Sequence, residues 1–263
     1  MKKLFVLMVL AAIVLTGCNK DKVTNLDEQI IGKWMTAERN GKPALTNEKS
    51  VITFVTPTQA YMSLSFNSRT DLPEMWSIES EVDVVIEGNK VTLTRHPDEH
   101  TTVVDVFTVT SIKDSEMKAN VKGTLTIDGE VVSTSNNDVR FVKVYDEYSS
   151  AIHGVWEGSM TSDQSQFDDG EEHRWEFKSD GSYWFFSRND EGEWVRKDDV
   201  FSQYFVDGVL MCARWMNAGE GQVENREWWE ISSIENGVMN WTALRMKDDG
   251  TTYTATFSMT KVQ

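Results

Sequence analysis

The chain has 263 residues, enough for one large domain or two small ones. Its formal net charge is −16, and residues 146–263 carry −13 of it. Such an acidic surface repels phosphate backbones, so the composition argues against nucleic acid as a partner. Solubility alone would explain the acidity equally well.

The N-terminal segment is typical of an export signal. Lys2 and Lys3 precede the apolar run Leu4–Thr16, which is too short to cross a bilayer as a folded helix. The run leads into "LTGC", which resembles the lipobox of bacterial lipoproteins. That resemblance implies cleavage before Cys18 and acylation of this cysteine. The alternative is an ordinary signal peptide followed by a chance cysteine.

We therefore expect a signal peptide over residues 1–17 and a lipidated linker over residues 18–27. An acyl group, and not a spanning segment, would hold the mature protein on the membrane. Asn19 follows the cysteine where an aspartate would signal inner-membrane retention in enteric bacteria, so we predict an outer-membrane lipoprotein in the cell envelope, in either leaflet. Cys212 is then the only other cysteine, which predicts a fold without a disulfide and a buried, unreactive thiol.

Two short stretches of the chain are nearly the same. "IIGKW" ends at Trp34 and "IHGVW" ends at Trp156, an offset of 122 residues. Similar residues continue at this offset, among them Tyr61 with Tyr183. A sustained offset indicates two copies of one unit of about 115 residues, an ordinary domain size.

Each copy has the pattern of a β-sheet. Asn-Gly and Asp-Gly pairs recur, and they close tight hairpins because both residues tolerate positive φ. In Thr252–Met259, apolar residues such as Tyr253 and Phe257 alternate with threonine and serine, the period of a half-buried strand. We predict an all-β protein of two tandem antiparallel meander barrels, over residues 28–145 and 146–263.

The order "GKW", "ITF", "GNKVTLT", "FTVTSI", "FVKV" resembles the lipocalin-like domains of Bacteroidetes lipoproteins, and Gly-x-Trp resembles the lipocalin signature. The resemblance implies an eight-stranded up-and-down barrel in each copy. The glycine, Gly32 or Gly154, would let another segment approach closely. The tryptophan, Trp34 or Trp156, would close the narrow end of the barrel.

The same resemblance implies an arginine from the end of the barrel that packs on the tryptophan ring. Arg140 fits this role for Trp34. The second copy has Ser258 at the matching position, with Lys261 nearby as a weaker substitute for an arginine.

Two stretches are candidates for metal binding. "HPDEH", His96–His100, would present both histidines to one metal on a helix, but Pro97 and the neighbouring strands favour a hairpin loop. "DDGEE", Asp168–Glu172, lacks the alternation of a calcium loop and favours a solvated loop. The sequence has no glycine-rich phosphate loop, nucleophile elbow or CxxC pair. We therefore expect no metal, no cofactor and no catalytic residues, in a protein that is not an enzyme.

The strongest bias in the composition is the distribution of aromatic residues, because eight of the ten tryptophans lie in the second half of the chain. "YWFF" and "EWWE" place aromatic rings on both faces of their strands. A small barrel needs only one aromatic face inside, so the other face is either covered by the first domain or available for binding. We select five aromatic residues as the lining of a ligand site in the second barrel: Trp175, Tyr183, Trp194, Trp215 and Trp229.

Three functions fit this sequence. The expected one is binding of a small hydrophobic or amphipathic molecule in the mouth of a barrel. A second is a surface module whose aromatic rings stack on glycans or dock a partner protein. A third is a structural pair of barrels filled by their own side chains. The oligomeric state stays open.

Overall fold

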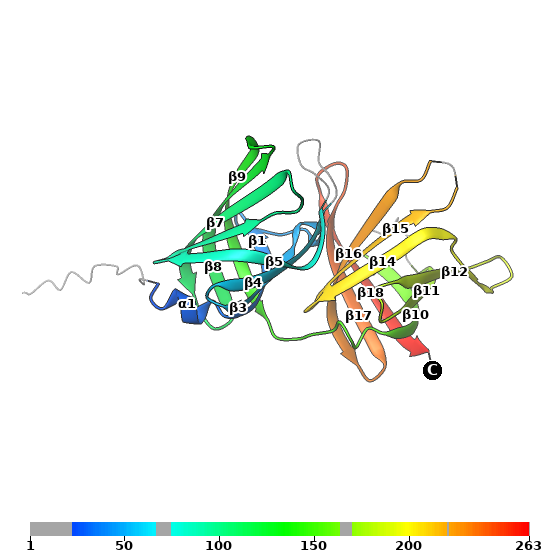
Figure 1. Ribbon diagram of the computed structural model, residues 1–263. Coiled ribbons are helices and arrows are strands. Elements are labelled where there is room, and N and C mark those ends of the chain that lie inside the picture. Colours follow the sequence, from blue (N-terminus) through cyan, green and yellow to red (C-terminus); the bar gives the residue numbers. More distant parts are fainter. Residues whose placement is uncertain (1–22, 67–74, 164–169, 220, 263) are drawn as a thin grey trace, which may run out of the picture.

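The computed structural model describes residues 23–66, 75–163, 170–219 and 221–262. The expected signal peptide, Cys18 and the first two residues of the "DDGEE" run lie outside these residues. Within the described residues, strands form two nine-stranded antiparallel sheets that lie one after the other along the chain (Figure 1). The helical parts are α1 (Leu26–Gln29) and the 3-10 turn η1 (Thr46–Glu48). The prediction of an all-β protein with two tandem barrels is confirmed.

The first sheet closes on itself. Its strands follow one another as a meander, and β1 also pairs with β9, so eight strands form a closed barrel. The short β2 extends β1 as a side hairpin. The strands are β1 (Gly32–Arg39), β2 (Lys42–Pro43), β3 (Ser50–Thr56), β4 (Gln59–Phe66), β5 (Met75–Glu87), β6 (Lys90–Arg95), β7 (Thr101–Ile112), β8 (Glu116–Ile127) and β9 (Glu130–Val144).

The second sheet curves in the same way but has a seam. Its order begins with β13 and ends with β14. Among the described residues, one isolated bridge joins Ser182, the residue before β12, to Gln203 of β14. The Tyr204 amide donates to the Gly181 carbonyl beside this bridge, at 2.8 Å. The hairpin of β12 and β13 projects from the barrel (Figure 1). The strands are β10 (Gly154–Ser162), β11 (Glu172–Phe177), β12 (Tyr183–Arg188), β13 (Trp194–Arg196), β14 (Asp199–Asp207), β15 (Leu210–Asn217), β16 (Glu224–Glu235), β17 (Val238–Met246) and β18 (Thr252–Val262).

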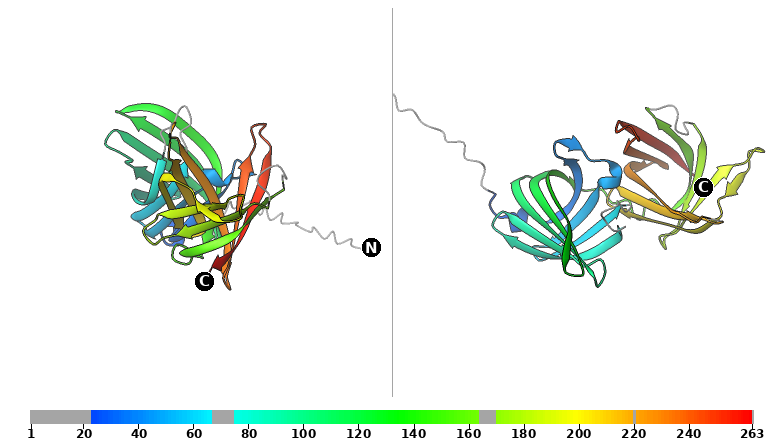
Figure 2. Two further views of the ribbon diagram at one scale, coloured as in Figure 1. Left: turned by 90° about the vertical axis from the view of Figure 1, so that its right-hand side faces the viewer. Right: turned by 90° about the horizontal axis from the view of Figure 1, so that it is seen from above.

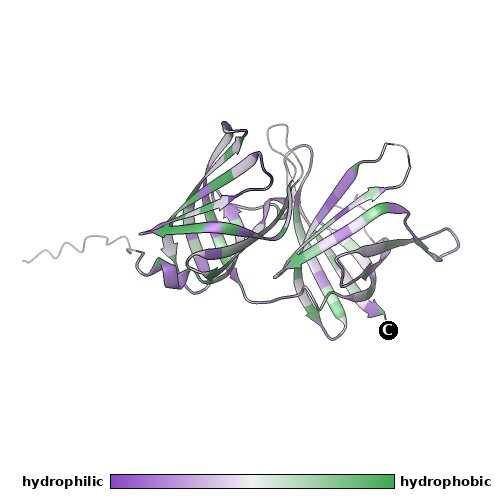
Figure 3. Cartoon of the chain, in the orientation of Figure 1, coloured by the Kyte–Doolittle hydropathy of each residue, from purple (hydrophilic) through white to green (hydrophobic). Residues whose placement is uncertain are grey.

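Each barrel has its own interior core, because alternate side chains of most strands point inward. On β18, Tyr253, Ala255, Phe257 and Met259 are buried while the threonines between them are exposed, as the alternation predicts. Colouring by hydropathy shows this alternation along most strands of both sheets (Figure 3).

The repeated Gly-x-Trp motif builds the same corner in both barrels. The Trp34 indole is fully buried, and its Nε1–H donates to the Ile30 carbonyl at 2.7 Å. The cation over its ring is Lys143, 5.0 Å from the centroid. Arg140, predicted to pack on this ring, instead pairs outward with Glu38 at 2.7 Å, because its position on β9 faces away from the interior.

The second barrel repeats the corner with equivalent residues. The Trp156 Nε1–H donates to the Ile152 carbonyl at 2.6 Å, and Lys261 lies 5.1 Å from the ring centroid. The lysine at the end of the last strand, expected only as a weaker substitute, therefore occupies the ring face in both copies.

The two barrels pack against each other through β14, β15 and β16 (Figure 2). Met35 and Val51 of the first barrel form one buried cluster with Phe205, Leu210 and Cys212 of the second. Burial raises the pKa of the Cys212 thiol well above its ordinary value, so it stays protonated and inert, as expected.

Polar contacts fix the edge of this interface. Arg226, with a side chain only 2% exposed, donates to the carbonyls of Phe66 and Met75 at 2.7 and 2.5 Å. The Trp228 Nε1–H donates to the Ser65 carbonyl at 2.9 Å. The outward aromatic residue of "EWWE" is therefore covered by the first domain.

Candidate functional site

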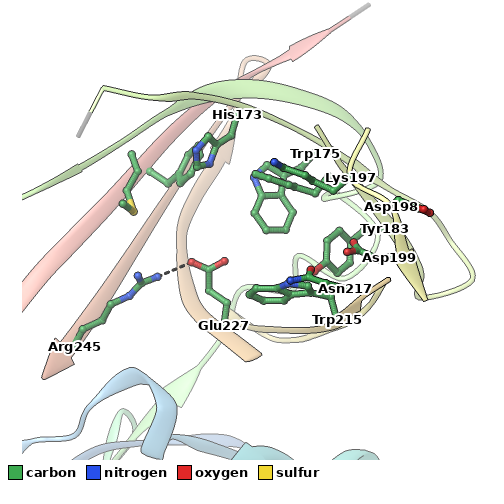
Figure 4. Close-up of a pocket in the computed structure, with 13 residues that line it drawn as sticks. His173, Trp175, Tyr183, Lys197, Asp198, Asp199, Trp215, Asn217, Glu227 and Arg245 are labelled. Atoms are coloured by element: carbon green, nitrogen blue, oxygen red, sulfur yellow. Dashed lines mark hydrogen bonds and ion pairs between the residues drawn. The ribbon is translucent and has the colours of Figure 1, made fainter. Parts of the chain in front are cut away.

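The second barrel contains a cavity of about 390 Å³ (Figure 4). On β10 its lining residue is Met160, four residues along the strand from Trp156, so the cavity lies away from the closed end. The segment around Lys197, which follows β13, borders it on the side of the open seam. The lining consists of Met160, His173, Trp175, Tyr183, Phe185, Lys197, Asp198, Asp199, Trp215, Asn217, Glu227, Arg245 and Phe257.

Aromatic rings form one wall of the cavity. Trp175 lies 5.1 Å from Tyr183 and 5.0 Å from Phe185, measured between ring centroids. These rings come from β11 and β12, whose residues alternate inward, and packing on one another holds them in place. Trp215 enters from β15 on the facing side (Figure 4). The wall is thus a rigid apolar surface suited to a flat or hydrophobic molecule.

An ion pair forms a polar edge of the same cavity. The Arg245 guanidinium donates to the Glu227 carboxylate at 2.8 Å, the contact that the dashed line marks in Figure 4. Arg245 also lies 4.4 Å from the ring centroid of Trp229, so its orientation is fixed from both sides.

One hydrogen-bond donor of the lining has no acceptor. The Trp175 Nε1–H is buried and has no hydrogen-bond partner among the described residues. The core indoles of Trp229 and Trp241 likewise have no partner among the described residues, whereas those of Trp34, Trp156 and Trp228 donate to carbonyl oxygens at 2.6–2.9 Å. Of the three indoles without a partner, Trp175 is the one that lines the cavity, so an oxygen of a ligand or a water could accept from it.

Tyr183 supplies a second polar group. Burial first, and then the nearby carboxylates Glu227 and Asp199, raise the pKa of its hydroxyl far above the ordinary value. The hydroxyl therefore remains protonated at any physiological pH and acts as a neutral polar group in the aromatic wall.

The five aromatic residues selected from the sequence lie in three different environments: the cavity, the barrel core and the outer face of the sheet. Trp175, Tyr183 and Trp215 line the cavity. Trp229 lies in the barrel core, 1% exposed, and packs against Trp241 and Phe257. Trp194 lies on the outer side of the sheet between two arginines.

The sequence selection missed several polar lining residues. Glu227 stands two positions before Trp229, and His173 stands two before Trp175, so strand alternation places each on an inward face. This signal was present in the sequence. Lys197 and Asp199 lie at the seam, and their position depends on how the barrel closes, which local periodicity does not encode.

The outer face of β11, β12 and β13 carries a ladder of alternating cations and rings. Trp194 lies between Arg174 at 4.9 Å and Arg188 at 4.2 Å, measured from the guanidinium carbon to the ring centroid. Trp184 contacts Lys178 at 3.1 Å and Arg196 at 4.6 Å from its centroid. We call these six residues the outer ladder. The outward aromatics of this hairpin thus have cationic neighbours on their faces.

The histidine stretch forms a loop, as the proline suggests. His100 Nδ1 lies 2.8 Å from an Asp128 carboxylate oxygen, and His96 Nδ1 lies 3.3 Å from the Thr102 hydroxyl. Among the described residues there is no group of three or more histidine, cysteine, aspartate or glutamate side chains that could hold a metal. The same residues include no helix long and apolar enough to cross a membrane.

No protein-family model matches the chain, and no curated protein matches it. Solved structures of the vaccine antigen transferrin binding protein B (TbpB) from Haemophilus parasuis Hp5 share similarity with it. One mutant is 7% identical with a TM-score of 0.27, covering 82% of this chain and 53% of that chain. Another mutant is 8% identical with a TM-score of 0.26, and the match covers 88% of this chain and 75% of that chain. The chain spans about half the length of the first structure, and at these TM-scores the likeness carries no functional argument.

Proposed function

We propose that this protein is a non-catalytic binding lipoprotein of the cell envelope, and that its second barrel holds a small amphipathic molecule. The observation that carries the proposal is the cavity of about 390 Å³ between the rings of Trp175 and Trp215. Its size is that of known small-molecule sites, which combine apolar walls with a few polar groups. A barrel filled by its own side chains would not leave this volume, so the structural alternative is weaker.

The cavity also defines the chemistry of its ligand. The aromatic wall favours an apolar, flat body. The unsatisfied Trp175 Nε1–H favours a hydrogen-bond acceptor on that body, such as a carbonyl, ether or hydroxyl oxygen. The lining carboxylates of Asp198, Asp199 and Glu227 outnumber the two cations Lys197 and Arg245, which disfavours an anionic ligand.

Stacking on glycans receives less support. The outward rings of Trp184 and Trp194 already have cations against their faces, and Trp228 is covered by the first barrel. A sugar ring would have to displace these cations before it could stack.

The neutral dye N-phenyl-1-naphthylamine tests the proposal, because its fluorescence rises in apolar sites. We expect saturable binding to the purified protein. Trp215→Ala should weaken it at least about tenfold by removing part of the wall. Trp194→Ala is the matched control, since it removes a tryptophan of the same barrel from the outer ladder and should leave the affinity unchanged. Equal affinity in both variants would refute a site in this cavity.

Membrane attachment has a separate test. Cells that express the full chain are labelled with an alkyne analogue of palmitate. Label should appear on the protein and disappear in Cys18→Ala but not in Cys212→Ala, which removes the only other cysteine. Label that persists in Cys18→Ala would contradict acylation at this position.

A further inference from the structure

The first barrel also contains a cavity, of about 230 Å³. Its lining includes Arg39 and Phe66, the last residues of β1 and β4, and Met75, the first residue of β5. These strand ends lie at the open end of the barrel, away from Trp34. Four positions at or beside β5, β6, β7 and β8 line both cavities at the offset of 122: Met75 with Lys197, Arg95 with Asn217, Asp105 with Glu227, and Gly123 with Arg245.

The equivalent positions carry different charges. In the first barrel the ion pair joins Arg95 to Asp105 at 3.1 Å, whereas in the second it joins Glu227 to Arg245. A Cβ on Gly123, the position that Arg245 occupies in the second barrel, would meet the Ser135 Oγ at 2.7 Å and the Asp105 Oδ1 at 2.9 Å. Glycine at this position therefore lets the Ser135 hydroxyl and the Asp105 carboxylate lie close against the backbone of β8.

Arg39 adds a further cation to this cavity. Glu38 pairs outward with Arg140, and a bulge in β1 between Thr36 and Glu38 shifts the residues that follow it. In β10 the register runs without a bulge, and Met160 lines the second cavity there. The arginine is thus specific to the first barrel.

No carboxylate of the described residues balances the charge of Arg39. It forms no ion pair with any described residue, and its one hydrogen bond to them goes to the Glu48 carbonyl at 3.2 Å. The Nε atoms of Arg39 and Arg95 are both buried without an acceptor in the described part of the chain. Two guanidinium groups therefore face one carboxylate, Asp105. A partly buried cation without a counter-charge is costly unless an anion joins it.

We propose that the mouth of the first barrel is a second ligand site, for a small molecule that carries an oxyanion, a carboxylate or a phosphate, on an apolar body. The Arg39 guanidinium pairs with the oxyanion, and the Ser133 and Ser135 hydroxyls offer further donors. Val103 and Leu125 contact the apolar body. The site is independent of the function proposed for the second barrel, whose cavity has the opposite charge balance.

The test is calorimetric titration of the purified protein at low ionic strength with three probes. Sodium octanoate carries a carboxylate on an apolar chain, 1-octanol carries the same chain without charge, and sodium phosphate carries the anion alone. We expect octanoate to bind with one-to-one stoichiometry and octanol to bind at least about tenfold more weakly. If phosphate binds as tightly as octanoate, the ligand is a small free anion without an apolar body, and Arg39 remains the residue that pairs with it.

Variants locate the site. Arg39→Gln should weaken octanoate binding at least about tenfold. Arg140→Gln, which removes an outward arginine from the neighbouring strand, should leave it unchanged. Trp215→Ala should also leave it unchanged, which separates this site from the second cavity. Thermal unfolding of each variant checks that it is folded. If Arg39→Gln does not fold, Arg39→Lys takes its place: it keeps the charge but loses the guanidinium geometry, so it should bind octanoate more weakly than the wild type while retaining part of the affinity.

Three results would overturn the proposal. The first is wild-type affinity for octanoate in Arg39→Gln. The second is an equal loss in Arg39→Gln and Arg140→Gln, which would indicate general surface electrostatics. The third is the absence of binding to the wild-type protein by either octanoate or phosphate at about 10 mM, weaker than a paired guanidinium in a cavity should give.

Discussion

A glycine, a tryptophan and a lysine pack as one unit at the closed end of each barrel. Gly154 has φ +127°, a conformation that residues with a Cβ rarely adopt. A Cβ at this position would lie 2.7 Å from Lys261 Cε, because the lysine passes over the glycine to reach the ring of Trp156. Gly32, Lys143 and Trp34 repeat the arrangement with the same 2.7 Å distance. The repeated "G-x-W" therefore encodes a backbone turn and a cation site together.

Substitution of this glycine should be costly. We expect Gly154→Ala to lower the free energy of unfolding by roughly 1–3 kcal/mol, from backbone strain and displacement of Lys261. The control Gly192→Ala also has positive φ, +79°, but open space at its Cβ, so it should cost about 1 kcal/mol. Urea unfolding of the two variants measures the difference. Equal losses would show that the lysine contact contributes nothing.

Neighbouring tryptophans of the second barrel point to opposite faces of the sheet, because side chains alternate along a strand. On β16, Trp228 faces the first barrel and Trp229 faces the core, while Glu227 reaches the cavity on the same inward face as Trp229. The sequence shows that aromatic residues occupy both faces of this strand. It does not show which face meets the other barrel, because that depends on contacts between residues more than a hundred positions apart.

Trp229 should therefore contribute to the stability of the fold and not to ligand affinity. We expect Trp229→Ala to cost about 3–5 kcal/mol of unfolding free energy, because the indole is 1% exposed and its removal leaves a cavity under Arg245. Trp215→Ala, at a half-buried lining position, should cost less and act on ligand affinity instead. Thermal and urea unfolding distinguish the two. A smaller loss for Trp229→Ala than for Trp215→Ala would contradict the placement of Trp229 in the core.

The sequence predicts the elements of this fold better than it predicts the sites. The offset of 122, the hairpin turns and the alternation in β18 predict two β-barrels, because these signals are local or repeated. The assignment of Arg140 to the ring of Trp34 was wrong, because the sequence does not reveal that Arg140 faces outward to Glu38. The inward position of Arg39 likewise depends on a bulge that has no sequence signature here.

At the scale of the whole molecule, ion pairs join the two barrels and their linker. Lys33 of the first barrel pairs with Asp207 of the second and with Glu147 of the linker, at 2.6 Å for Glu147. Burial alone would lower the pKa of Lys33, but its two carboxylate partners outweigh burial and raise it. Burial would raise the pKa of Glu147, but hydrogen bonds from Lys33 and the Ser149 amide outweigh it and lower the pKa. The junction is therefore charged at neutral pH.

This junction should make stability depend on pH in acid. A carboxylate whose pKa is lowered by folding stabilises the folded state above its unfolded value of 4.5, and that contribution disappears as the pH falls through the folded pKa. Glu147→Gln should therefore destabilise the protein at pH 7 and have progressively less effect below about pH 4.5. Calorimetric unfolding from pH 7 to pH 3 tests this. Glu130→Gln, at an exposed position, is the control, and a Glu147→Gln effect that does not change with pH would contradict the linkage.

Native mass spectrometry can detect a ligand in the second barrel directly, on the mature protein purified gently from the membrane of the cells that make it. We expect a discrete non-covalent adduct in addition to any acyl anchor. The adduct should be lost on denaturation, and lost or reduced in Trp215→Ala but not in Trp194→Ala. A clean mass for the wild-type protein, or an adduct that persists equally in both variants, would contradict a ligand in the aromatic cavity of the second barrel.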